Sequence, residues 1–156
     1  MADLAKANLI ANIFPDSRKT SLSGILNYEP EDASDKWLTG RKSVSNSSTD
    51  LIAAAYDYFD DGAVTNTSDE CRWIMIKNVS TTATDGVMID LGGGSAAWNG
   101  HGVVIGAGET VILKPAGGVS NGDIHAISVT MNGINGRPTG THSGTVDIVY
   151  AAIFDD

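Results

Sequence analysis

The chain has 156 residues, 42% of them hydrophobic, which is enough for one domain with a single core. Ten Lys and Arg residues against 19 Asp and Glu residues give a net charge of −9, which argues against binding to nucleic acid or an anionic membrane, because both need basic residues. The 18 Gly residues and the 6% aromatic content are typical of tight turns between short strands and do not fit a helical bundle.

Residues 1–40 differ from the rest of the chain. Residues 4–14 are mildly apolar without a clean period, 22–29 are compatible with a strand, and 30–36 form an acidic loop. This pattern predicts an N-terminal arm that buries apolar anchors on a neighbouring subunit. An equal alternative is that residues 1–40 supply one or two outer strands of the chain's own sandwich. The candidate anchors for such a subunit interface are Leu9, Ile10, Ile13, Phe14, Trp37 and Leu38.

The next stretch is ambiguous. Residues 41–49 fit either an edge strand or a loop. Within 49–62, Thr49 as an N-cap and Gly62 after the last residue favour a helix, whereas the alternation of apolar residues favours a strand. We favour the strand.

A series of short strands follows and defines the predicted fold. The segment 72–79 has an apolar centre and predicts a strand in the middle of a sheet, with Lys77 and Asn78 returning the chain to solvent. Cys71, the single cysteine, excludes an intramolecular disulfide, and we expect it to start this strand as a small buried residue. Further strands are predicted at 87–91, 103–105, 109–114, 123–131 and 145–154. Residues 41–156 are therefore predicted to form an all-β, antiparallel β-sandwich.

Patterns that would indicate catalysis or a cofactor are weak. His101, His125 and His142 lack the spacing of a metal motif; we expect His125 in the core, and His101 and His142 in loops that face water. The glycines at 92–94 follow a strand, but the phosphate-binding pattern is incomplete and no basic residue is near. We therefore expect no enzyme activity, no metal and no cofactor.

One loop offers an alternative function. Trp98 lies in a Gly-rich segment beside Asn99 and His101, where an exposed aromatic ring can stack on a sugar. These three residues predict a possible exposed recognition loop. The alternative interpretation is therefore a carbohydrate- or receptor-binding module.

Residues 73–126 have a recognisable layout: a strand ending in Lys-Asn, a Ser/Thr turn, a second strand, a Gly-rich loop and a Gly-x-Gly-Glu turn into an apolar strand. The segments concerned are WIMIKNVSTTATDGVMIDLGGG, GVVIGAGETVILKP, DIHAISV and the closing VDIVYAAIF. In these segments the chain resembles small β-sandwich virion proteins of tailed bacteriophages, in particular capsid decoration (cement) proteins. Residues 1–70 carry no such resemblance, which leaves as the alternative a tail, fibre or spike component that acts as a carbohydrate- or receptor-binding module.

The resemblance implies a jelly-roll-like sandwich and a structural role on the outside of a phage capsid. The implied partner is the major capsid protein, in a homo-oligomer for which a trimer is favoured over a dimer, without a cofactor or catalysis. A shell filled with DNA is pushed outward, so a cement protein must add buried interface where capsomers meet, on the order of 1,000 Å². No apolar run reaches 18 residues and no secretory signal begins the chain, so we expect synthesis in the host cytoplasm, no membrane association and a final place on the virion surface.

Overall fold

The computed structural model describes the backbone of seven segments of the chain, and these form two units, Met1–Asp35 and Lys36–Asp156. Each unit is considered by itself. The described residues are 5–13, 20–28, 36–52, 70–91, 102–114, 124–132 and 138–155.

In the first unit, β1 (Ala5–Ile13) and β2 (Thr20–Tyr28) form an antiparallel pair. The register runs without a shift from Ala5 opposite Tyr28 to Ile13 opposite Thr20. The sequence prediction of a strand at 22–29 is confirmed, whereas β1 was not foreseen because its apolar residues do not alternate. Whether this hairpin acts as an arm on a neighbouring subunit stays a prediction.

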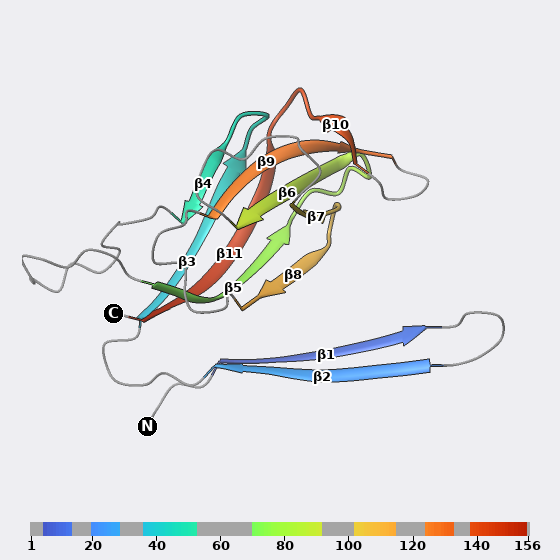
Figure 1. The fold of residues 1–156 in the computed structure, drawn as a ribbon. Coiled ribbons are helices and arrows are strands. Elements are labelled where there is room, and N and C mark those ends of the chain that lie inside the picture. The colour runs from blue at the N-terminus through green and yellow to red at the C-terminus, as the bar shows by residue number, and fades with distance from the viewer. Residues whose placement is uncertain are drawn as a thin grey trace, which may run out of the picture. The chain divides into compact units, whose positions relative to one another are not determined.

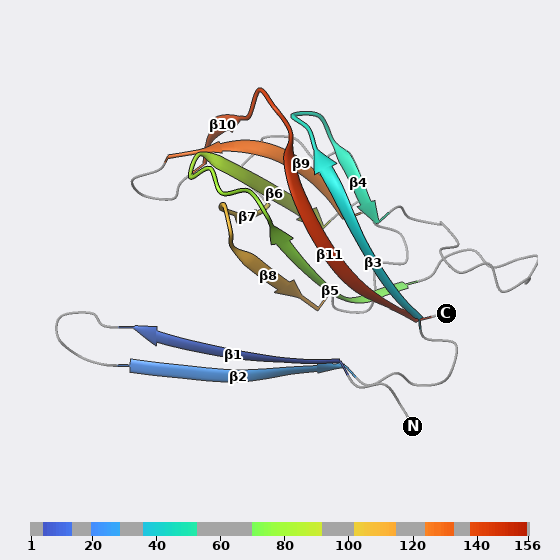
Figure 2. The same cartoon turned by 180° about the vertical axis from the view of Figure 1, so that it is seen from behind.

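Over its described residues, the second unit is an antiparallel β-sandwich (Figures 1 and 2). A four-stranded sheet has the order β3-β11-β5-β8, and a five-stranded sheet has the order β10-β9-β6-β7, with β4 also paired to β9. The all-β sandwich predicted from the sequence is confirmed. The strands are β3 (Lys36–Val44), β4 (Thr49–Ile52), β5 (Glu70–Asn78), β6 (Asp85–Leu91), β7 (Val103–Ile105), β8 (Thr110–Leu113), β9 (Ile124–Met131), β10 (Pro138–Thr141) and β11 (Val146–Asp155).

Successive strands change sheet through short segments. Four pairs of successive strands have one member in the four-stranded sheet and the other in the five-stranded sheet: β3 and β4, β5 and β6, β7 and β8, and β10 and β11. Hydrogen bonds join these connections to strands of the four-stranded sheet: Val79 N–H donates to the Asp147 carbonyl of β11 at 3.0 Å, and Gly108 N–H donates to the Asn78 carbonyl of β5 at 3.1 Å. We call this set of connections the crossing end, defined by residues 45–48, 79–84, 106–109 and 142–145.

The core lies between the two sheets. Ile74 and Ile76 of β5 and Ile148 of β11 meet Val87 and Ile89 of β6, and all five are at most 1% exposed. Cys71 is also fully buried in this cluster, as expected, and burial raises its pKa to about 12. Each such aliphatic side chain contributes about 1.5–3 kcal/mol when it leaves water, so this cluster is the main source of stability.

A second apolar cluster lies on the opposite face of the five-stranded sheet. Met88 of β6 and Ile127, Val129 and Met131 of β9 alternate with the core residues of their strands and are at most 6% exposed, with Val104 packed against them. His125 shares this face and is 5% exposed, which confirms its predicted burial. Gly86 leaves the space that the Met131 side chain fills, because a Cβ there would lie 2.5 Å from the Met131 sulfur.

Two details of the sandwich differ from the sequence prediction. The unit boundary falls before Lys36 instead of after residue 40, because β3 pairs with β11 along its whole length. β10 occupies Pro138–Thr141, where the sequence predicts no strand. Residues 49–52 are a strand, as favoured, and the rest of the ambiguous 49–62 segment lies outside the described residues.

Candidate functional site

The predicted interface residues fall into three groups. Leu9, Ile10 and Ile13 lie in β1, and Phe14 lies outside the described residues. Trp37 and Leu38 are part of β3, where they stand opposite Ile153 and Ala152 of β11. The structure therefore places two of the predicted arm anchors in the sandwich itself. The predicted recognition loop, with Trp98, Asn99 and His101, lies outside the described residues.

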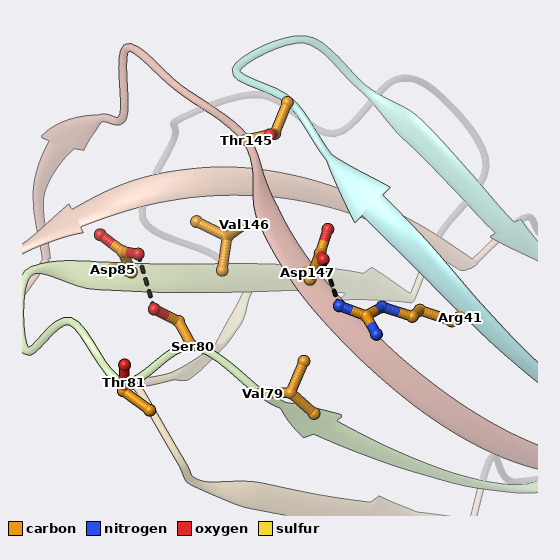
Figure 3. Close-up of a pocket in the computed structure, with 8 residues that line it drawn as sticks. All are labelled: Arg41, Val79, Ser80, Thr81, Asp85, Thr145, Val146 and Asp147. Atoms are coloured by element: carbon orange, nitrogen blue, oxygen red, sulfur yellow. Dashed lines mark hydrogen bonds and ion pairs between the residues drawn. The ribbon is translucent and has the colours of Figure 1, made fainter.

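Two hollows are found on the described surface of the sandwich. The first is polar and lies at the crossing end, with a volume of about 270 Å³. Figure 3 shows its lining: Arg41 of β3 reaches toward Asp147 of β11, and Ser80 lies against Asp85 at the start of β6. The residues that line it are Arg41, Val79, Ser80, Thr81, Asp85, Thr145, Val146 and Asp147.

Asp147 is the charged centre of one side of this hollow. Its carboxylate accepts a short hydrogen bond from the Ser43 hydroxyl and one from Arg41 Nη2 at 2.6 Å. These two bonds, the one from Ser43 first, lower the pKa of Asp147 below its ordinary value. The Arg41 side chain is 67% exposed, so solvent screens the ion pair and its contribution to stability is small.

Asp85 organises the other side. Its Oδ2 accepts a hydrogen bond from the Ser80 hydroxyl at 2.7 Å, and its Oδ1 lies 3.4 Å from His142 Nε2. The expectation that His142 faces water is therefore wrong: its side chain is 22% exposed, because the turn after β10 brings it against β6. His142 Nδ1 accepts a hydrogen bond from Gly144 N–H at 3.0 Å, so in the neutral ring the proton is on Nε2, toward Asp85.

The Ser80, Asp85 and His142 arrangement does not match a nucleophilic triad. In such a triad the histidine contacts the serine and removes its proton, while the carboxylate orients the histidine. Here the carboxylate stands between the two. Across the described residues, moreover, no group of three or more His, Cys, Asp or Glu side chains is placed so that it could hold a metal ion. The contacts of Asp85 instead connect the turn before β6 to the turn before β11.

Asn78 sits under the polar hollow and is fully buried, so the expectation that it returns the chain to solvent is wrong. Its Nδ2 donates to the carbonyl oxygens of Asp85 at 3.1 Å and Ile105 at 3.3 Å, and its Oδ1 accepts from Ser80 N–H at 3.0 Å. A single side-chain amide thus joins the start of β6, the end of β7 and the turn between β5 and β6. Lys77, by contrast, is exposed as predicted.

The second hollow is apolar and lies on the outer face of the four-stranded sheet. It has a volume of about 170 Å³ and is lined by Met75 and Lys77 of β5 and by residues 149–151 of β11. Met75 is 36% exposed, and Val149 and Ala151 are half-buried. The sequence carried a signal for this surface, since β5 and β11 are apolar on both faces, although it did not show which face stays open.

The chain matches no protein-family model, no curated protein and no solved structure. In the part of the chain that the structure describes, no helix has the length and apolar character needed to cross a membrane.

Proposed function

We propose that this protein is a structural component of a phage virion that binds the outside of the capsid and stabilises it by bridging capsid subunits. The observation that carries the proposal is the strand order. Most strands that are neighbours in the chain lie in opposite sheets, and only β6 and β7, and β9 and β10, pair within one sheet among the described strands of this unit. The resulting order is β3-β11-β5-β8 in one sheet and β4-β9-β6-β7 in the other, with β10 also paired to β9. This order supports the jelly-roll-like interpretation, a double-sheet architecture of two Greek keys that is common in viral capsid and lectin domains.

The surfaces support a role that depends on contact between proteins. The apolar face around Met75, Val149 and Ala151 offers area that can be buried against a neighbouring chain. The net charge of −9 is compatible with a protein on the outside of a shell, which need not contact the genome. In this proposal the partner is the major capsid protein, the protein forms a homo-oligomer, with a trimer favoured over a dimer, and it catalyses no reaction.

Binding to shells tests the proposal. The full chain is mixed with phage shells that lack it, and co-sedimentation and electron microscopy measure occupancy and position. We expect saturable binding on the outer surface and release of packaged DNA at a higher temperature. The control is heat-denatured chain at the same concentration. Absence of binding, or density confined to the tail, contradicts the proposal.

The same preparation tests the alternative of a carbohydrate-binding module. Wild type and the Trp98→Ala variant are compared on a glycan array. Binding of a glycan by wild type and its loss in the variant would favour the alternative function. Equal absence of signal from both proteins would count against it.

A further inference from the structure

The outer face of the four-stranded sheet has an open apolar centre. On β11, Ala151 stands between Thr39 of β3 and Met75 of β5, and one row further Val149 stands between Arg41 and Lys77. Directly opposite residues share a face, so these side chains form one continuous surface. Its hollow of about 170 Å³ is almost entirely apolar, apart from Lys77, and Arg41 lies in the neighbouring strand opposite Val149.

The size of the hollow matches one side chain and not a cofactor. Sites for small molecules and cofactors have volumes of about 300–1,000 Å³, well above the value here. An apolar cavity of about 150 Å³ holds a benzene molecule, so a hollow of about 170 Å³ has room for a single phenyl or isobutyl group. Interfaces between proteins often concentrate their affinity on such an anchor side chain in a pocket.

The charges at the border indicate what accompanies that side chain. Arg41 is neutralised by Asp147, whereas no carboxylate of the described residues pairs with Lys77. The hollow therefore has a positive border on a chain whose net charge is −9. A second copy is a poor occupant, because a two-fold contact through this face would bring two Lys77 ammonium groups together and two acidic chains with them. A carboxylate on a different protein complements this border.

We infer that this hollow is a docking site for one Phe or Leu side chain of another protein, presented beside a carboxylate that pairs with Lys77. The inference deepens the proposed function by naming the surface used, and it rests on that function only for the identity of the partner as a shell protein. The hydrophobic anchor supplies the affinity, and the ion pair at the border selects the sequence around it.

Peptide titration tests the docking site directly. The full chain, carrying ¹³C-methyl methionine, is titrated with a capped Gly-Asp-Phe-Gly peptide, and the Met75 methyl signal is identified with the Met75→Leu variant. We expect a saturable shift of that signal. Replacing Phe by Ala in the peptide should abolish the shift, and replacing Asp by Asn should weaken binding by about 1.4- to 5-fold, as expected for an exposed ion pair.

Variants of the chain supply the matched controls. Ala151→Glu puts a carboxylate in the hollow and should weaken peptide binding by about ten-fold or more. Thr141→Glu adds the same charge at an exposed position of β10 and should bind like wild type. Lys77→Gln, at an exposed strand position, should abolish the difference between the Asp and Asn peptides even if Ala151→Glu fails to fold.

The results separate this inference from the proposed function. No saturable Met75 shift, or equal shifts with the Phe and Ala peptides, overturns the docking site. Folded Ala151→Glu protein that occupies shells like wild type also overturns it, while the proposed capsid role stands. Peptide binding by a protein that occupies no shell supports the docking site and contradicts the capsid role.

Discussion

Replacing Asn78 tests whether a single buried amide fixes the crossing end. Asn78→Ala removes three hydrogen bonds from a fully buried position, at 3.1, 3.3 and 3.0 Å. At about 0.5–1.5 kcal/mol for each bond, we expect the free energy of unfolding to fall by about 2–4 kcal/mol. With an m-value of about 1.5 kcal/mol/M, a loss of about 3 kcal/mol lowers the urea midpoint by about 2 M, measured by tryptophan fluorescence.

Asn78→Asp sharpens the test, because it keeps the shape and removes the two donors. At pH 7 the new carboxylate faces the carbonyl oxygens of Asp85 and Ile105, and we expect a loss of about 3–5 kcal/mol, as for an uncompensated buried charge. Burial raises the folded-state pKa of the introduced carboxyl above its unfolded value near 3.9. The deficit relative to wild type is therefore smallest below about pH 4, grows by about 1.4 kcal/mol per pH unit, and levels off above the raised pKa.

The matched control for the added charge is Thr81→Asp, at an exposed position of the same turn. We expect it to stay within about 0.5 kcal/mol of wild type at every pH. If Asn78→Asp and Thr81→Asp unfold at the same urea concentration at pH 7, the side chain of Asn78 does not hold the crossing end, and the reasoning fails.

Three further predictions concern the remaining described residues. Gly40→Ala should destabilise the protein by about 1–3 kcal/mol in urea unfolding, because a Cβ there would lie 2.7 Å from the Tyr150 ring. Gly140→Ala, with open space around the added Cβ, should be neutral or slightly stabilising, and equal effects of the two substitutions would contradict this. Cys71, whose pKa burial raises to about 12, should resist iodoacetamide at pH 8 in the native protein and react in urea; rapid native alkylation would argue against its burial. Ser43→Ala and Arg41→Ala should each raise the Asp147 pKa, measured by NMR titration, because each removes a hydrogen bond that lowers it, the one from Ser43 being the largest single cause. Since the folded-state pKa of Asp147 is lowered, the stabilisation from these contacts is present above the unfolded-state pKa and is lost as the pH falls through the folded-state pKa. An Asp147 pKa that is unchanged in both variants would refute the role of these two hydrogen bonds.

Strands with a regular pattern could be predicted from the sequence. β5, β6, β9 and β11 alternate apolar side chains and end at Gly, Asn or Asp, so their existence and approximate limits followed from the residues. β3 and β10 could not be foreseen, because the polar residues of KWLTGRKSV and PTGT give no period of two. Each takes its strand conformation from pairing with a long neighbour, β11 and β9 respectively.

The polar contacts of the crossing end were beyond sequence reasoning for a different reason. Asp85 and His142 are 57 positions apart in the chain, and they meet only because β6 and β10 both pair with β9. Asn78 ends a strand with a polar residue, which normally indicates exposure. Its burial depends on connections from β5 to β6 and from β7 to β8 that a linear pattern does not encode.

The two sheets differ in how far their outer apolar faces are covered, and this difference favours the proposed docking surface. Strands that are apolar on both faces cannot bury both in a two-layer sandwich, so the second face must be covered or remain open. On the five-stranded sheet, Met88, Ile127 and Val129 are at most 3% exposed, so that face is closed. On the four-stranded sheet, Ile153 is fully buried but Met75 is 36% exposed on the same face. The open apolar area is thus local and lies beside Lys77, where a partner can cover it.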